Sequence, residues 1–233
     1  MRHLLSAACG LSLLCAQPVL ADDVVVVELF TSQGCVACPP ADAFFTALAQ
    51  DPRVLPLALH VDYWDYIGWA DSFAKPRFTE RQKSYARAIG SRTIYTPQFI
   101  IGGTDRLEGY EQNVTEAAMA ERLNSAPAAA VHLAATRAGD TLVIRAEAPA
   151  AFEAPVRVQL VRYEPEQTVV IERGENAGKT ITYHNVVTEW TVLGDWSGAE
   201  PLDTTVSLTG GAPAVVILQA EGPGRILAAA RTD

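Results

Sequence analysis

The sequence predicts an α/β domain followed by a smaller all-β domain of sandwich-like character. Residues 24–125 alternate short apolar stretches typical of strands with stretches of helical periodicity, a pattern that favours an α/β layer with crossover connections. An Ala- and Pro-rich run at 125–130 then interrupts the pattern. Beyond it, short strand-like stretches separated by turn residues recur at regular spacing, as in a β-sandwich. We therefore expect one domain over 22–126 and a second over 127–233.

Each element of the first domain has its own signal. The stretch 24–30 is β-branched and nearly all apolar, as in a strand buried on both faces. A second strand falls at 54–61, but proline is awkward in a central strand, so Pro56 suggests that the strand proper begins at Leu57. A short strand at 98–101 precedes two glycines. Helical periodicity covers 39–49, 72–90 and 111–124.

The second domain shows only strand signals. Turn residues lie at Gly139-Asp140 and Gly210-Gly211. The predicted strands are 130–136, 141–148, 156–162, 168–172, 186–193, 204–208 and 214–220.

The N-terminus has the layout of a secretory signal peptide over residues 1–21. Arg2 supplies a positive start, 4–15 is apolar, and Val19-Leu20-Ala21 offers small residues at the positions a signal peptidase reads. The apolar run is shorter than the ~20 residues of a spanning helix, and no later stretch is long and apolar enough. We expect a periplasmic or secreted protein, cleaved near Ala21, with no stable membrane insertion. A buried N-terminal helix is the alternative.

Charge and cysteine usage narrow the function. The chain carries a formal net charge of −9, which argues against nucleic acid and anionic lipid surfaces as partners. Of its four cysteines, Cys9 and Cys15 fall in the predicted signal peptide. The mature chain would retain only Cys35 and Cys38, in a compartment that permits disulfides.

Cys35-Val36-Ala37-Cys38 lies between a predicted buried strand and a predicted helix. Unpaired N–H groups at a helix N-terminus favour a thiolate, the nucleophile of disulfide exchange. We expect Cys35 to be the exposed attacking thiol and Cys38 to resolve the mixed disulfide, with Gly34 leaving room for a partner's backbone. Pro39 disfavours helical geometry at Cys38, which would weaken the effect of the helix on Cys35.

Two other interpretations of the cysteine pair stay open. One CxxC supplies two metal ligands, whereas a structural zinc site needs four, and the mature chain has only His60, His132 and His184 as further candidates. The pair could also be a purely structural local disulfide. We predict neither a metal site nor a cofactor.

The segment 94–103, with Thr96-Pro97 directly before a short strand and Gly102-Gly103 after it, resembles the thioredoxin superfamily when taken with the CxxC. In that superfamily a cis proline packs against the CxxC, and the residue before it offers its backbone to an extended substrate. The resemblance implies that Pro97 is cis and that Thr96 faces the substrate. A trans proline in a loop is the alternative.

More narrowly, the chain resembles an uncharacterised family of secreted bacterial thioredoxin-like proteins, a domain of unknown function. The matching stretches are 28–35, 60–65 and 173–179. Thioredoxins also keep a buried acid beneath the cysteines, and Glu28 is the nearest candidate here. Burial would raise the pKa of Glu28. Alternatively, Glu28 points to an edge or pairs with an arginine.

Two further segments have open roles. The stretch 62–69 follows the second strand, where Trp64 and its neighbours would line a groove beside Cys35 or fill the core. The loop 173–179 would pack over the thiols or have no chemical role.

These observations predict an exported thiol-disulfide oxidoreductase that acts on thiols or disulfides of other exported proteins and needs a redox recycling partner. The alternative is a non-catalytic thioredoxin-fold binding module, with copper or zinc as its ligand.

Overall fold

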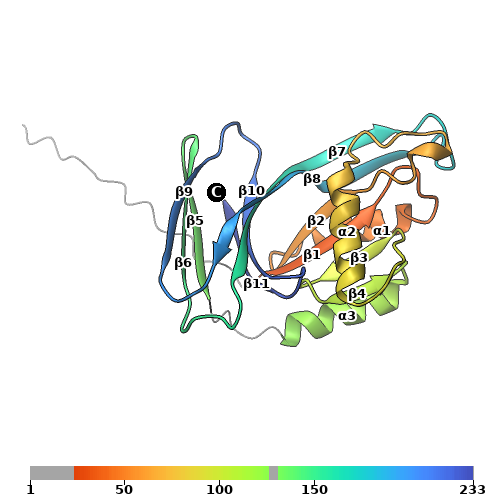
Figure 1. Ribbon diagram of the computed structural model, residues 1–233. Coiled ribbons are helices and arrows are strands. Elements are labelled where there is room, and N and C mark those ends of the chain that lie inside the picture. Colours follow the sequence, from red (N-terminus) through yellow and green to blue (C-terminus); the bar gives the residue numbers. More distant parts are fainter. Residues whose placement is uncertain (1–23, 126–130, 233) are drawn as a thin grey trace, which may run out of the picture.

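The computed structural model describes residues 24–125 and 131–232, so the predicted signal peptide lies outside the described part. Its strands form an eight-stranded sheet, ordered β11-β10-β7-β8-β2-β1-β3-β4, and a three-stranded sheet, ordered β5-β6-β9 (Figure 1). No helix among the described residues is long and apolar enough to cross a membrane. The expected mixture of an α/β layer with a smaller β region is confirmed at this level.

The first half supplies one end of the large sheet and the helices. Strand β1 (Val25–Thr31) pairs in parallel with β2 (Val54–His60) and antiparallel with β3 (Gln98–Ile101), which pairs with β4 (Asp105–Glu108). The helical segments are α1 (Pro39–Leu48), the short 3₁₀ helix η1 (Asp65–Ile67), α2 (Pro76–Ala88) and α3 (Gln112–Ser125).

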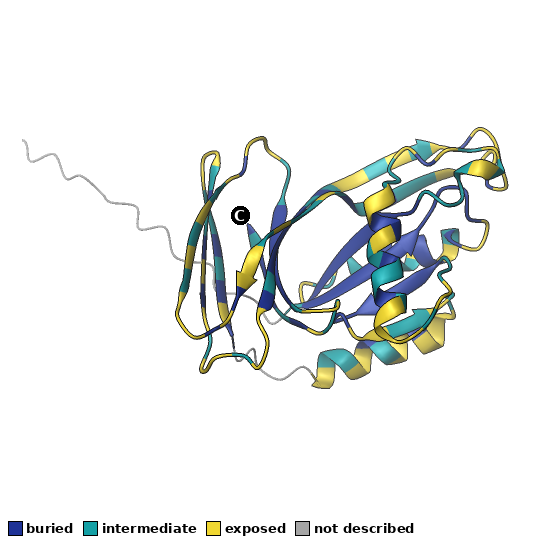
Figure 2. Cartoon of the chain, in the orientation of Figure 1, coloured by how far each residue is buried: buried dark blue, intermediate teal, exposed yellow. Residues whose placement is uncertain are grey.

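The two faces of β1 are covered by different helices. Val25, Val27 and Leu29 pack with Phe45 of α1 and Met119 of α3. The alternate residues of the strand, Val26 and Phe30, pack instead with Phe78 and Tyr85 of α2. Because successive side chains of a strand point to opposite faces, this explains why the whole strand is buried and why it is apolar apart from Glu28 and Thr31 (Figure 2).

The strands beyond residue 126 divide between the two sheets: three of them form the small sheet, and the other four extend the large one. Strands β7 (Val156–Val170) and β8 (Thr180–Trp196) form a long antiparallel hairpin, and β8 joins β2 in parallel at Ala58 and Val186. Strands β10 (Ala214–Ala220) and β11 (Ile226–Thr232) extend the same sheet beyond β7. The strands predicted at 156–162 and 168–172 are thus one continuous strand.

The three-stranded sheet consists of β5 (His132–Ala138), β6 (Thr141–Glu147) and β9 (Leu202–Ser207). Its inward residues, among them Leu133, Leu142 and Ile144, share a core with Val158 of β7 and Val216 of β10. The small sheet therefore packs in a sandwich-like way on one end of the large sheet, and the long hairpin runs from there to the end that carries the helices (Figure 1).

Pro56 does not delay the second strand, since β2 begins at Val54 and Pro56 is in register with Val27. The only backbone pair between β2 and β8 lies further along, at Ala58. At Pro56, a side chain of β8 takes the place of backbone pairing: Asn185 Nδ2 donates to the Pro56 carbonyl at 2.9 Å. The missing N–H of proline therefore interrupts no paired ladder with β8.

Candidate functional site

Cys35 and Cys38 form a disulfide in the turn that links β1 to α1. The Cys35 N–H donates to the Ser32 carbonyl at 3.1 Å, and the Cys38 N–H donates to the Cys35 carbonyl at 3.2 Å. Cys38 is the N-cap of α1 and has helical backbone angles (φ −80°, ψ −35°). The expected conflict between Pro39 and helical geometry at Cys38 is therefore overridden, and both prolines occupy the first helical turn, where their missing N–H groups leave no hydrogen bond unmade.

The prediction that Cys35 is exposed is wrong. Its side chain is only 2% exposed and that of Cys38 is fully buried, whereas Val36 between them is 57% exposed. The cause is the segment after β2. A Cβ placed on Gly34 would lie 3.2 Å from Trp64 Cβ. Trp64 therefore occupies the space beside Gly34 in which the sequence predicts the backbone of a partner protein.

The Thr96–Pro97 peptide bond is cis, as the resemblance implied. The Thr96 carbonyl oxygen lies 3.6 Å from the Cys35 sulfur, so this loop flanks the disulfide. Across the site, the indole N–H of Trp64 donates to Thr96 Oγ1 at 2.7 Å. Trp64 thus bridges from Gly34 to Thr96 on either side of Cys35. This Trp64–Thr96 bridge lies beside the buried Cys35.

The loop 173–179, at the tip of the long hairpin, packs against the cysteine turn. Asn176 is buried, and its Nδ2 donates to the carbonyl oxygens of Gln33 at 3.0 Å and Cys35 at 2.8 Å. Lys179 Nζ donates to Asn176 Oδ1 at 2.7 Å and so orients the amide. Of the two interpretations of this loop, packing over the thiol site is the correct one.

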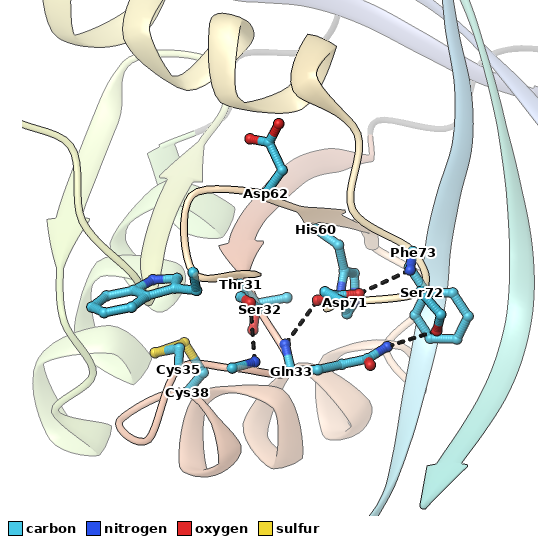
Figure 3. A network of polar contacts seen from close by, with 12 residues as sticks. Thr31, Ser32, Gln33, Cys35, Cys38, His60, Asp62, Asp71, Ser72 and Phe73 are labelled. Carbon is cyan, nitrogen blue, oxygen red and sulfur yellow. Dashed lines mark hydrogen bonds and ion pairs between the residues drawn. A yellow bond between two sulfur atoms is a disulfide. The ribbon is translucent and has the colours of Figure 1, made fainter. Parts of the chain in front are cut away.

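A buried carboxylate organises the other side of the turn (Figure 3). Asp71 Oδ2 accepts from the Gln33 N–H at 2.8 Å and lies 2.7 Å from His60 Nδ1, while its Oδ1 accepts from the Phe73 N–H at 2.8 Å. Burial alone would raise the pKa of Asp71, but the neighbouring His60 and the two N–H donors lower it. The side chain of Gln33 is held as well, by Trp69 Nε1 at 2.8 Å and Ser72 Oγ at 3.1 Å.

Asp42 is the buried acid on the helix of the cysteine pair. It lies four residues after Cys38, so the two side chains share one face of the helix. Thr31 Oγ1 donates to Asp42 Oδ1 at 2.8 Å, whereas Oδ2 has no hydrogen-bond partner among the described residues. Burial raises the pKa of Asp42 to about 7, against the opposing effect of the Thr31 hydrogen bond. His60 Nε2 and the Tyr183 hydroxyl are likewise buried without such a partner.

Glu28, expected beneath the cysteines, has a different environment. Its carboxylate accepts from Arg81 Nε at 2.6 Å, from Arg81 Nη2 at 2.8 Å and from the Tyr85 hydroxyl at 2.5 Å. Because side chains alternate along β1, Glu28 points to the face covered by α2, whereas α1 and Cys38 belong with the opposite face. The alternative of an arginine partner is therefore correct, and the expected role beneath the thiols is not supported.

The histidines and cysteines that the structure describes do not gather into a metal site. His60 is engaged by Asp71, and His184 lies 3.1 Å from Thr46 Oγ1 and 3.3 Å from Glu166. His132, in β5, is exposed. In residues 24–125 and 131–232, no group of three or more His, Cys, Asp or Glu side chains is arranged to hold a metal ion.

Sequence reasoning missed Asp42 and Asp71 and did not single out Asn176. The spacing of Asp42 from Cys38 was a usable signal, because i and i+4 side chains are neighbours on a helix. Asn176 lay in a matched stretch, but nothing local indicated its partners. Asp71 carried no local signal for this site, because Gln33 and His60 come from segments well before it in the chain.

The fold and the site define a mixed α/β protein with a shielded CxxC disulfide at the start of a helix. The chain belongs to the family described as protein of unknown function (DUF1223), whose model matches residues 26–219. A structural-genomics crystal structure from Agrobacterium tumefaciens is similar, with 33% identity, a TM-score of 0.73 and coverage of 89% of this chain and 92% of that one.

A second solved structure, HBP35 of Porphyromonas gingivalis, shares the fold at 16% identity and a TM-score of 0.62. The alignment covers 92% of this chain and 76% of that one. No curated protein matches the sequence.

Proposed function

We propose that this protein is an exported thiol-disulfide oxidoreductase of thioredoxin type, acting on disulfides of other exported proteins. The observation that carries the proposal is the position of the Thr96 carbonyl, 3.6 Å from the sulfur of Cys35 and directly before the cis proline. A disulfide with a purely structural role needs no such neighbour. A carbonyl beside the sulfur can instead pair with the backbone of an extended substrate.

The proposed exchange proceeds in two steps. In the dithiol form, the Cys35 thiolate attacks one sulfur of a substrate disulfide, forming a mixed disulfide and releasing the other substrate sulfur as a thiolate. The Cys38 thiolate then attacks the Cys35 sulfur, closes the Cys35–Cys38 bond and releases the second substrate thiolate. Two electrons pass from the cysteine pair to the substrate, and a dithiol recycling partner restores them.

Two features of the site support these steps. Cys35 lies just before the N-terminus of α1, and the positive end of the helix dipole favours its thiolate. Cys38 is buried and must lose a proton before it attacks. Asp42 lies on the same helix face, and a pKa of about 7 suits a carboxylate that accepts this proton near neutral pH.

The burial of Cys35 adds a requirement. A substrate sulfur must approach in line with the bond that breaks, so the Trp64–Thr96 bridge has to part before exchange. Parting exposes the Thr96 backbone at the same time. Gly34, Trp64 and Thr96 then become the surfaces that meet the substrate, with Pro97 behind them.

The test is to trap mixed disulfides. The Cys38→Ser variant, expressed with its own signal peptide and quenched with acid, is expected to accumulate disulfide-linked exported proteins on non-reducing gels. The Cys35→Ser variant is the matched control and is expected to trap none. Equal trapping by both variants, or none by either together with no reduction of insulin by the wild-type protein, would overturn the proposal.

A further inference from the structure

A pocket of about 440 Å³ lies away from the disulfide, where α2 faces β7, β8 and the turn after β10. None of the cysteine-site residues lines it. Its volume is within the range of small-molecule sites, roughly 300–1,000 Å³. The pocket therefore has room for a small organic ligand.

The floor of this pocket is held in place by a closed network. The Arg81 guanidinium carbon lies 3.7 Å from the centroid of the Trp190 ring, while Glu28, Tyr85 and Gln219 accept from the guanidinium N–H groups. Trp190 Nε1 donates to Gln159 at 2.8 Å, and Gln159 Nε2 donates to Gln219 at 3.0 Å. The ring and the guanidinium are therefore preorganised before any ligand arrives, which lowers the entropic cost of binding.

The rim carries arginines that are less well paired. Arg77 has no polar partner among the described residues, and Arg157 Nε is buried without a hydrogen bond, with its nearest carboxylate oxygen, on Asp195, at 3.6 Å. Arg87 donates to Ser84 Oγ at 2.9 Å and lies 4.0 Å from Glu80, which is already engaged by Lys83 at 2.7 Å. Arginine side chains with N–H donors that lack partners are therefore grouped around this pocket, although the chain as a whole has a net charge of −9.

We propose that this pocket binds a small carboxylate ligand with an apolar body. The carboxylate would be bound by Arg157 and Arg77, because the guanidinium fork matches its two oxygens. The apolar body would contact Trp190, Val192 and Pro223, which line the same pocket. The site uses no thiol, so it does not depend on the oxidoreductase proposal.

Phenylacetate is a suitable probe, and phenethylamine is its cationic counterpart of similar size. Titration of the ¹⁵N-labelled full chain is expected to give a saturable shift of the Trp190 indole N–H with phenylacetate and none with phenethylamine. The signal is assigned from its loss in Trp190→Phe. The Cys35→Ser, Cys38→Ser double variant is expected to bind equally well, which separates this result from any failure of redox activity.

The Arg157→Gln variant is expected to bind phenylacetate at least roughly tenfold more weakly, as the loss of a charged hydrogen bond implies. Arg225→Gln, in the turn after β10 but outside the pocket lining, is the matched control and is expected to bind like the wild type. Equal shifts with the two probes, equal weakening by the two variants, or no saturable shift would overturn the proposal.

Discussion

Asn176 donates a 2.8 Å hydrogen bond to the carbonyl of Cys35, a residue 141 positions earlier in the chain. The bond joins the tip of the β7–β8 hairpin to the turn that holds the disulfide. The same amide also satisfies the Gln33 carbonyl. The geometry of the cysteine pair therefore depends on the C-terminal half of the protein as well as on its own strand and helix.

Asn176→Ala is expected to destabilise the protein by about 2–3 kcal/mol, because two buried carbonyls lose their donor. Chemical denaturation of the oxidised protein measures the change. Glu175→Ala, exposed on the same loop, is the control and is expected to stay within about 0.5 kcal/mol of the wild type. Equal effects of the two substitutions would show that the two hydrogen bonds contribute little.

Asp42 makes stability depend on pH. Its pKa is raised from 3.8 to about 7, so its neutral form is favoured in the folded state. The neutral carboxyl therefore makes its full contribution to the free energy of unfolding below about pH 4. That contribution is lost as the pH rises from 4 to 7, by up to roughly 4 kcal/mol. Asp42→Asn is expected to remove this decline in denaturation curves recorded across the range. Asp51→Asn, at a half-buried position, is expected to keep it.

If the proposed exchange is correct, Asp42 also controls the rate of the resolving step. When Cys35 carries a thionitrobenzoate group, attack by Cys38 releases the dye, and the release is followed by absorbance. In the wild type the rate is expected to rise through about pH 7 as Asp42 becomes a carboxylate able to accept the Cys38 proton. Asp42→Asn is expected to lose this inflection and to react roughly a hundredfold more slowly at neutral pH. An unchanged profile would remove Asp42 from the mechanism.

Trp64→Phe is expected to speed reduction of the disulfide by a small phosphine reductant roughly two- to tenfold. The reason is that the variant loses the one hydrogen bond that holds the Trp64–Thr96 bridge together. The bond in question is that from Trp64 Nε1 to Thr96 Oγ1. Tyr66→Phe, at a position 81% exposed, is the matched control. A rate equal to that of the control would mean that the Trp64–Thr96 bridge does not limit access.

Glu28→Gln is expected to cost about 3–5 kcal/mol, because it leaves the Arg81 guanidinium without its buried counter-charge. Glu80→Gln, which breaks an exposed pair with Lys83, is expected to cost about 0–1 kcal/mol. A measurable change in the reduction potential of the cysteine pair in Glu28→Gln would restore the role first expected for this residue.

Local patterns predicted the local parts of the site. The apolar run of β1, the CxxC before a helix and the Thr96-Pro97 pair each stand in one short stretch, and the structure has the strand, the turn and the cis peptide there. The environment of Glu28 was not predictable in this way. Its burial could be inferred from the strand, but its choice of Arg81 depends on which helix covers which face.

The pairing of β8 with β2, which joins the two halves of the chain, was not predictable from the sequence for the same reason. Strand periodicity shows that 186–193 is extended but not that Val186 pairs with Ala58, since pairing partners so far apart leave no periodic mark. The sequence pattern divides β7 into two strands, because polar residues such as Glu164 and Glu166 interrupt its apolar stretches.

The hairpin tip over the cysteine turn also has a consequence for the order of folding. The disulfide joins residues three apart, whereas the hydrogen bond from Asn176 to the Cys35 carbonyl spans 141 positions. Contacts between distant positions form late, because closing long loops is entropically unfavourable. During folding, the cysteine turn can therefore form before the hairpin tip has docked on it. The carbonyls of Gln33 and Cys35 gain their side-chain donor only when the β7–β8 hairpin is in place.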